Sequence, residues 1–163
     1  MKFRGRTIGF LVAGTMLALA GGYAVAADTT PAEIVKMRHD HMKDDIGASF
    51  KAIIDQLKTG MPDKKIVGDA AAKMAAMSRE LPKWFPKGSG PESGVKTLAK
   101  AEIWTTPDDF KAAADKLTVE TDKLVQVAAT GDVAALADQV KATGGACQGC
   151  HKPFREPPPP AKK

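Results

Sequence analysis

The segment 30–58, TPAEIVKMRHDHMKDDIGASFKAIIDQLK, decides the fold class of this chain. Thr30 and Glu33 have the spacing of a capping box, and Pro31 stands at the first helical position, where its missing N–H costs nothing. Apolar residues then recur every three or four positions, which predicts one long amphipathic helix that ends before Gly60. Its apolar line consists of Ile34, Met42, Ile46, Phe50, Ile53 and Leu57. A helix of this kind needs packing partners to bury its apolar side.

Three further helices are predicted, and we find no convincing period-two strand pattern. The second covers about residues 69–79, and the third begins at Thr106 as its N-cap and ends at Gly131. The fourth follows and includes His151. Their apolar faces comprise Ala70, Met74 and Met77; Phe110, Ala114, Leu117, Thr121, Leu124 and Ala128; and Val133, Leu136, Val140, Cys147 and His151. We therefore predict an all-α fold, an antiparallel up-down-up-down four-helix bundle.

The connection 81–106 is long and contains three prolines and three glycines. It also carries Trp84, Phe85 and Trp104, which polar linkers rarely contain. We expect this loop to pack on the bundle.

The N-terminal residues 1–26 have the three regions of a secretory signal peptide. Three cations precede the uncharged segment 7–20, and Ala24-Val25-Ala26 forms a small-residue cleavage site. The alternative is an uncleaved anchor, since no charge appears between Thr7 and Ala27, a length close to that of a membrane span. Cleavage lowers the formal net charge from +5 to +2, because Lys2, Arg4 and Arg6 are removed.

We expect residues 27–156 to form the bundle and residues 157–163 a Pro-rich disordered tail. No phosphate-binding loop and no clustered basic stripe remains in the mature chain. We therefore expect no nucleic-acid partner and no stable membrane span after processing.

The segment Cys147-Gln148-Gly149-Cys150-His151 carries the chemistry. C-x-x-C-H is the attachment signal of c-type haem. On a helix its two thiols and its imidazole are related as i, i+3 and i+4 and project from one face. Both thiols can then form thioethers with the porphyrin while the imidazole of His151 reaches the iron. The sequence thus predicts one covalently attached haem c.

Three other roles are conceivable for these two cysteines. A structural disulfide joins residues that a helix orients poorly for it. A thioredoxin-like pair stands at the start of a helix that follows a strand, whereas this motif comes late in a helix. A structural zinc site needs four ligands, and only His39 or His41 could complete the set. Export favours haem over all three, since c-type maturation takes place outside the cytoplasm.

Met42 lies on the apolar line of the first helix, whose early part faces the late part of the fourth in an up-down-up-down bundle. A thioether is a normal haem ligand, which makes Met42 the candidate distal ligand. The alternative is that this methionine fills the core. Adjacent helical positions point about 100° apart, so we expect His41, like His39, at the surface or rim.

Several segments together resemble the cytochrome c′ family, the class II c-type cytochromes. They are Arg38-His39-Asp40-His41-Met42-Lys43, Trp84-Phe85-Pro86, Ala101-Glu102-Ile103-Trp104, the haem motif near the C-terminus, and Phe154-Arg155. In that family the residue four positions after the arginine of the first helix lies over the distal face of the haem, and here this residue is Met42.

The resemblance implies a periplasmic one-electron carrier, with His151 as proximal ligand, Met42 as distal ligand and Arg38 beside a haem propionate or edge. It also implies redox partner proteins in the periplasm and a homodimer in some members. The alternative is a high-spin, five-coordinate protein that binds nitric oxide or another diatomic gas. A peroxidase-like enzyme is disfavoured, because no acid–base group stands beside Met42 on the apolar line. Arg155 is expected near the imidazole of His151.

Overall fold

The computed structural model describes residues 29–159. The predicted signal peptide 1–26 and the end of the predicted tail, 160–163, lie outside the described residues. The elements in chain order are α1 (Pro31–Asp40), η1 (His41–Gly47), α2 (Ala48–Lys58), α3 (Lys64–Glu80), η2 (Leu81–Trp84), η3 (Pro91–Ser93), α4 (Glu102–Thr105), α5 (Pro107–Thr130) and α6 (Val133–Phe154).

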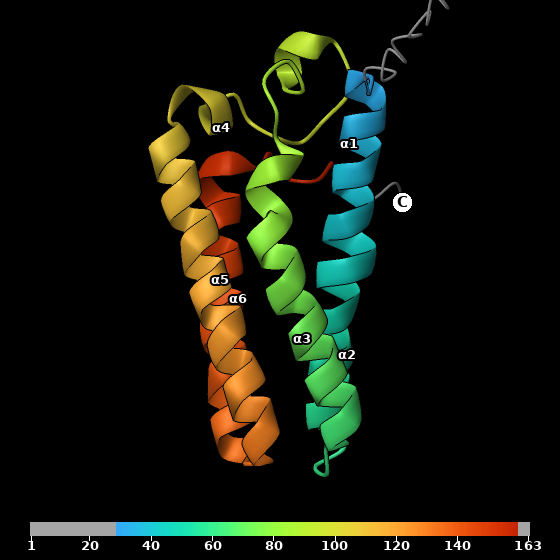
Figure 1. Ribbon diagram of the computed structural model, residues 1–163, viewed down its shortest axis with the longest axis vertical. Coiled ribbons are helices and arrows are strands. Elements are labelled where there is room, and N and C mark those ends of the chain that lie inside the picture. The colour runs from blue at the N-terminus through green and yellow to red at the C-terminus, as the bar shows by residue number, and fades with distance from the viewer. Residues whose placement is uncertain (1–28, 160–163) are drawn as a thin grey trace, which may run out of the picture.

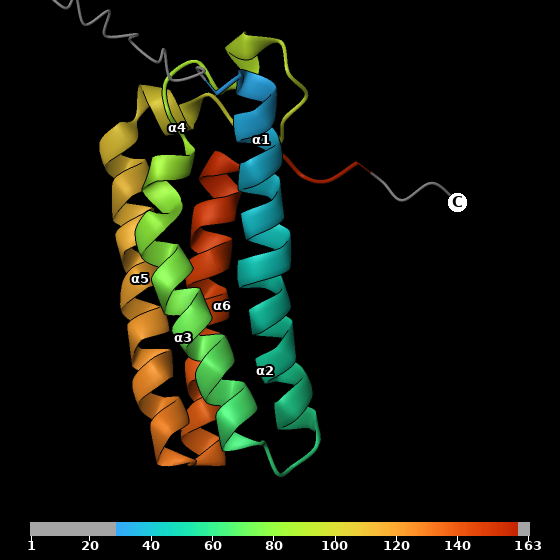
Figure 2. The same ribbon diagram turned by 45° about the vertical axis from the view of Figure 1, so that its right-hand side comes forward.

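The long helices form the antiparallel up-down-up-down bundle that the sequence predicts (Figure 1). The first helix is continuous and consists of α1, the π-helical turn η1 and α2. Helix α3 packs between α2 and α5, and α6 packs on α5 and also contacts α2. Figure 2 shows the start of α1 and the end of α6 at the same end of the bundle. No helix in the described part of the chain is long and apolar enough to span a membrane.

Helix boundaries follow local sequence signals at several ends. The capping box of α1 is present, since Thr30 Oγ1 accepts from the N–H of Glu33 at 3.3 Å and Glu33 Oε2 accepts from the N–H of Thr30 at 2.8 Å. Helix α5 ends at Gly131, whose φ of 76° lies in the left-handed region that glycine adopts without strain.

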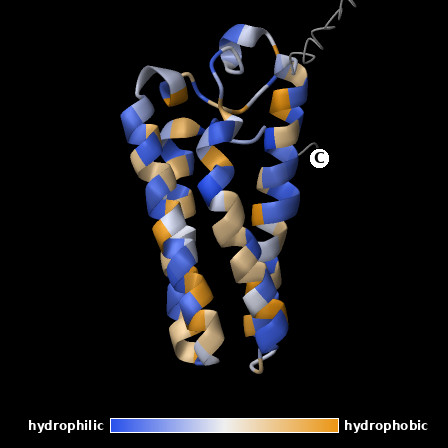
Figure 3. Ribbon diagram, viewed as in Figure 1, coloured by the Kyte–Doolittle hydropathy of each residue, from blue (hydrophilic) through white to orange (hydrophobic). Residues whose placement is uncertain are grey.

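The core confirms the predicted apolar face of the third helix. All six predicted residues of α5, from Phe110 to Ala128, are buried. Ile46 and Ile53 of the first helix and Leu136 of α6 are buried with them. Figure 3 shows hydrophilic and hydrophobic residues interspersed along the helices, as expected for helices with one buried side.

The second helix is longer than the sequence predicts, and its predicted apolar residues pack against the core without being its most buried ones. Helix α3 begins at Lys64, because the Asp63 side chain accepts from the N–H groups of Lys65 and Ile66. Met74 is buried as predicted, whereas Ala70 and Met77 are only half-buried. The buried set of α3 is Val67, Ala71, Met74, Ala75 and Ser78.

The start of α5 and the exposed side of α6 also differ from what the sequence predicts. Thr106 precedes α5, but its hydroxyl donates to the carbonyl of Glu102 at 2.9 Å and does not cap the helix. The unpredicted helix α4 brings that carbonyl within reach. On α6, Val133 and His151 are exposed, although the sequence predicts them on its apolar face.

The connection 81–106 packs on the bundle, as predicted. Trp84 is buried, and Phe85 and Trp104 pack against the core. The indole N–H of Trp104 donates to the carbonyls of Phe85 and Pro86 at 3.1 and 3.0 Å. An antiparallel bridge joins Ala99 to Arg155, which fixes the loop to the chain that follows α6.

Candidate functional site

The haem motif occupies the last two turns of α6. Cys150 is buried, Cys147 is half-buried and His151 is exposed. Both cysteines are free thiols and belong to the apolar cluster at the centre of the bundle. Helix α6 continues through Pro153 to Phe154, so the i, i+3, i+4 relation of the motif is kept.

The two thiols are held in their neutral form. Burial raises the pKa of Cys147 above its usual value. Burial, and secondarily the neighbouring Cys147, raise the pKa of Cys150 to about 11. A thioredoxin-type pair needs a lowered thiol pKa, as at a helix N-terminus, and this motif lies at the opposite end of its helix. The redox-pair alternative therefore has no support from the site.

The imidazole of His151 lies at the C-terminal end of α6. Although the residue as a whole is exposed, desolvation of the ring, followed by the positive charge of Arg155, lowers the pKa of His151. A lowered pKa favours the neutral imidazole, which is the form that coordinates a metal. Arg155, expected near His151, acts on it electrostatically, and the N–H of Arg155 donates to the His151 carbonyl at 3.0 Å.

The other two histidines, His39 and His41, lie beside carboxylates of the first helix. His39 is exposed beside Asp40. His41 Nδ1 lies 2.6 Å from Asp45 Oδ2, and its ring stacks on that of Trp84. Across residues 29–159, no group of three or more His, Cys, Asp or Glu side chains could hold a metal ion. The zinc alternative therefore lacks its ligands within the described residues.

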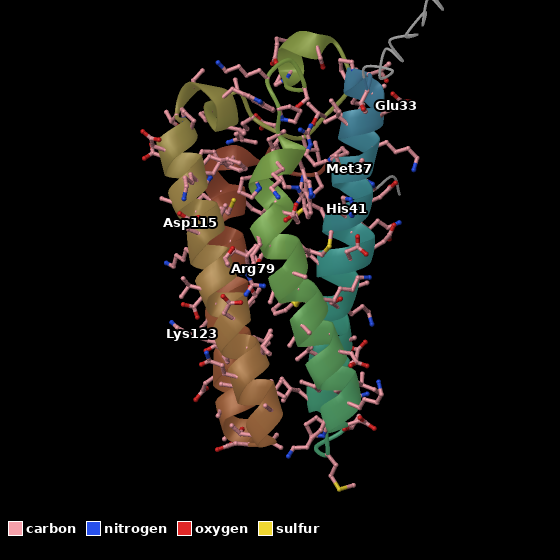
Figure 4. The ribbon with its side chains drawn as sticks, in the orientation of Figure 1. Glu33, Met37, His41, Arg79, Asp115 and Lys123 are labelled. Atoms are coloured by element: carbon pink, nitrogen blue, oxygen red, sulfur yellow. The ribbon has the colours of Figure 1, made fainter. Side chains whose placement is uncertain are left out.

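Met42 is the second residue of η1. Its side chain is half-buried and packs against the same apolar cluster that includes Cys150. The π-helical winding of this turn was not foreseen, because no residue type in the sequence signals it. Met37 and His41 line a shallow groove on the first helix, of about 260 Å³, and are labelled in Figure 4.

The guanidinium of Arg38, the residue expected beside the haem, is buried. It donates to the carbonyl and the hydroxyl of Ser89 at 3.2 and 3.4 Å, and to the hydroxyl of Thr97 at 2.9 Å. Its Cζ lies 4.6 Å from the ring centroid of Phe85 and 5.9 Å from that of Trp104. Burial lowers the pKa of Arg38, and the carboxylate of Glu92 opposes this shift.

The sequence does not reveal that Ser89 and Thr97 bind Arg38. Of its partners, only Phe85 and Trp104 were expected to pack on the bundle. Ser89 and Thr97 are 51 and 59 positions away along the chain. They lie in a loop without periodicity, so no spacing rule connects them to the first helix.

The donor set at the end of α6 fits a covalently attached haem. Two neutral thiols one turn apart and an adjacent neutral imidazole, all on one helix, are the groups that thioether formation and axial ligation require. The alternatives of a structural zinc and a redox-active thiol pair lack the groups or the pKa values that they need.

Comparison with known proteins agrees with this geometry. The family model described as cytochrome c′ matches residues 33–155. The chain belongs to the cytochrome c′ family. A cytochrome c′ of Pararhodospirillum photometricum is 37% identical over 125 residues, which is 76% of this chain and 91% of that protein. The crystal structure of cytochrome c′ from Rubrivivax gelatinosus superposes with a TM-score of 0.69 at 32% identity, over 78% of this chain and 98% of that chain.

Membership of the cytochrome c′ family identifies the cofactor as a c-type haem. This cytochrome c′ family member is a c-type haem protein with one covalently attached haem c. Homologues can form dimers. One related cytochrome c′, with a TM-score of 0.72 at 25% identity over 78% of this chain and 98% of that chain, is described as showing ligand-controlled dimer dissociation.

Proposed function

We propose that this protein is a periplasmic one-electron carrier and not an enzyme. Cys147 and Cys150 hold the haem through thioethers, His151 is the proximal ligand and Met42 is the distal ligand. When bound, the haem supplies an iron that alternates between the ferric and ferrous states. The protein's residues hold two axial donors in place so that the coordination changes little between the two states.

The antiparallel register of the first and last helices is the observation that carries the proposal. A Cβ at Gly144 of α6 would lie 3.5 Å from Cζ of Phe50 in α2, so these two residues face each other. Met42 stands eight positions before Phe50, and Lys152 stands eight positions after Gly144. An α-helix advances by about 1.5 Å per residue, and the π-helical stretch from Met42 to Gly47 advances somewhat less. The count therefore puts Met42 at about the level of His151 and Lys152, which supports the proposal.

Arg38 is suited to a role at the haem edge in addition to its contacts with the loop. A guanidinium carries five N–H donors, and three of the Arg38 donors bind Ser89 and Thr97. Two donors are therefore not used toward the described residues. Arg38 precedes Met42 by four positions, on the same side of the helix, where these donors can pair with a propionate.

A gas-binding protein is the second candidate, and one comparison favours it. A mutant of cytochrome c′ from Alcaligenes xylosoxidans, with the same fold at 22% identity, has been solved as a nitric oxide complex. In this alternative Met42 covers the distal face without coordinating the iron.

The two candidates differ in whether the distal position is closed to an added ligand. We propose to reduce the purified protein and expose it to carbon monoxide, with the Met42→Ala variant as reference. A carrier with a Met42 ligand gives a reversible one-electron potentiometric titration and binds carbon monoxide much more slowly than the variant. Equally fast binding by both proteins would favour the gas-binding candidate.

The partners and the location follow from the same proposal. Redox partner proteins in the periplasm would exchange electrons with the haem, after export directed by residues 1–26. A homodimer is compatible with the dimers of homologues.

A further inference from the structure

The first helix changes its winding at the residue proposed to reach the iron. Residues His41–Gly47 form a π-helical turn between α1 and α2. In this winding the backbone hydrogen bonds span five residues instead of four, so the turn contains one residue more than an α-helical turn. π-Helical turns are rare and occur frequently at functional sites. The turn therefore sets the direction of Met42 relative to α2.

The glycine that ends this turn leaves room that the π winding needs. A Cβ at Gly47 would lie 3.0 Å from the carbonyl oxygen of Met42, closer than ordinary van der Waals contact. The backbone of Gly47 is itself ordinary, with φ of −65° and ψ of −44°, so its dihedral angles do not require glycine. What favours glycine is the closeness of the Met42 carbonyl, five residues earlier, which would have to move by a few tenths of an ångström to make room for a Cβ.

Side chains hold the turn from two directions. His41 Nδ1 lies 2.6 Å from Asp45 Oδ2 within the turn, and Lys73 of α3 binds Asp45 Oδ1 at 2.7 Å. The ring of His41 stacks on Trp84 of η2, with centroids 4.9 Å apart. The residue before Met42 is thus linked to η2 directly and to α3 through Asp45, which favours a defined position for Met42 as well.

We propose that Gly47 is a positioning residue for Met42: by leaving space at the Met42 carbonyl it permits the π turn that directs the thioether toward the haem iron. This inference rests on the proposed placement of Met42 at the distal face. If the turn were rewound as an α-helix, Met42 would shift by one residue relative to α2, which corresponds to a rotation of about 100°.

The test compares Gly47→Ala with a matched glycine substitution. Gly68 lies inside α3, and among the described residues a Cβ there would meet no heavy atom within 4 Å. In the loaded protein, Gly47→Ala should lose the ferric methionine-to-iron charge-transfer band and bind carbon monoxide faster. Gly68→Ala should leave both properties unchanged. Nuclear Overhauser contacts between Met42 and residues 46–47 should show the rewound turn only in Gly47→Ala.

Failure of the inference can be distinguished from failure of the proposed ligation. A wild-type protein without the band would contradict ligation by Met42, and the role of Gly47 is then decided by the Overhauser contacts and the carbon monoxide rates. A Gly47→Ala protein that keeps the π turn, or that rewinds it without changing the band or the rate, would overturn the inference. Asp45→Asn, which weakens the contact with Lys73 without altering residue 47, should change the same readouts in the same direction but less.

Discussion

The imidazole of His41 stacks on the indole of Trp84, with ring centroids 4.9 Å apart and 24° between the ring planes. This contact joins the turn that carries Met42 to the first residues of the long connection. Trp84 is buried, with 5% of its surface exposed, whereas His41 is half-buried. The two partners therefore make unequal contributions to stability.

Trp84→Ala should lower the free energy of unfolding by about 3–5 kcal/mol, because it removes a large buried side chain and leaves a cavity. His41→Ala removes the stacking contact and should cost only about 0.5–1.5 kcal/mol. Urea denaturation of both variants checks the order. A Trp84→Ala protein as stable as His41→Ala would show that this tryptophan does not hold the connection on the bundle.

Arg38→Lys should lower the free energy of unfolding by about 1.5–3 kcal/mol. A lysine keeps the charge but cannot reproduce the bonds to Ser89 and Thr97 or the planar contact with Phe85. The matched control is Arg79→Lys, since Arg79 pairs with Asp122 at the exposed contact between α3 and α5. Arg79 is labelled in Figure 4, and its substitution should cost less than about 1 kcal/mol. Equal losses in the two variants would contradict the buried role of Arg38.

Asp63→Ala should lower the free energy of unfolding by about 1 kcal/mol, because the Asp63 carboxylate accepts from two N–H groups at the start of α3. Asp69→Ala is a suitable control, since among the described residues Asp69 pairs only with Lys65, at an exposed site. That variant should change stability by less than about 0.5 kcal/mol. Thermal unfolding of both variants measures the difference. An unchanged transition in Asp63→Ala would mean that the side chain does not cap the helix.

The thiols of the haem-free chain should react slowly with iodoacetamide when the chain is folded. The pKa of Cys150 is raised to about 11 by burial, so little thiolate is present at pH 8. An unfolded thiol has a pKa of about 8.5, so the unfolded state binds fewer protons than the folded state between that pH and the folded pKa. The free energy of unfolding should therefore decrease as the pH rises through this window.

Cys150→Ser is the control for the alkaline effect and should remove most of it. Far-UV circular dichroism verifies that the haem-free chain is helical under the conditions used. Equal alkylation rates in buffer and in urea would contradict the burial of the thiols.

The bundle was predictable because each long helix carries its packing information locally. The face of α5 repeats every three or four residues from Phe110 to Ala128, and every predicted member is buried. Helix α3 was harder, since its many small residues, such as Ala70 and Ala71, give no clear apolar side. There the buried face is set by packing between α2 and α5.

The haem motif was predictable from five consecutive residues, whereas the environment of Arg38 and Met42 was not. The contact of Arg38 with Thr97 depends on how the loop folds back across the end of the bundle. The π turn at Met42 depends on the space at Gly47 and on contacts from Lys73 and Trp84. Such contacts are tertiary, and no local pattern encodes them.

The optical spectrum of the purified ferric protein, recorded beside that of Met42→Ala, tests the central claim most directly. A carrier with His151 and Met42 as axial ligands gives a low-spin spectrum with a methionine-to-iron charge-transfer band, and the band disappears in Met42→Ala. A high-spin spectrum that the substitution leaves unchanged would contradict this assignment.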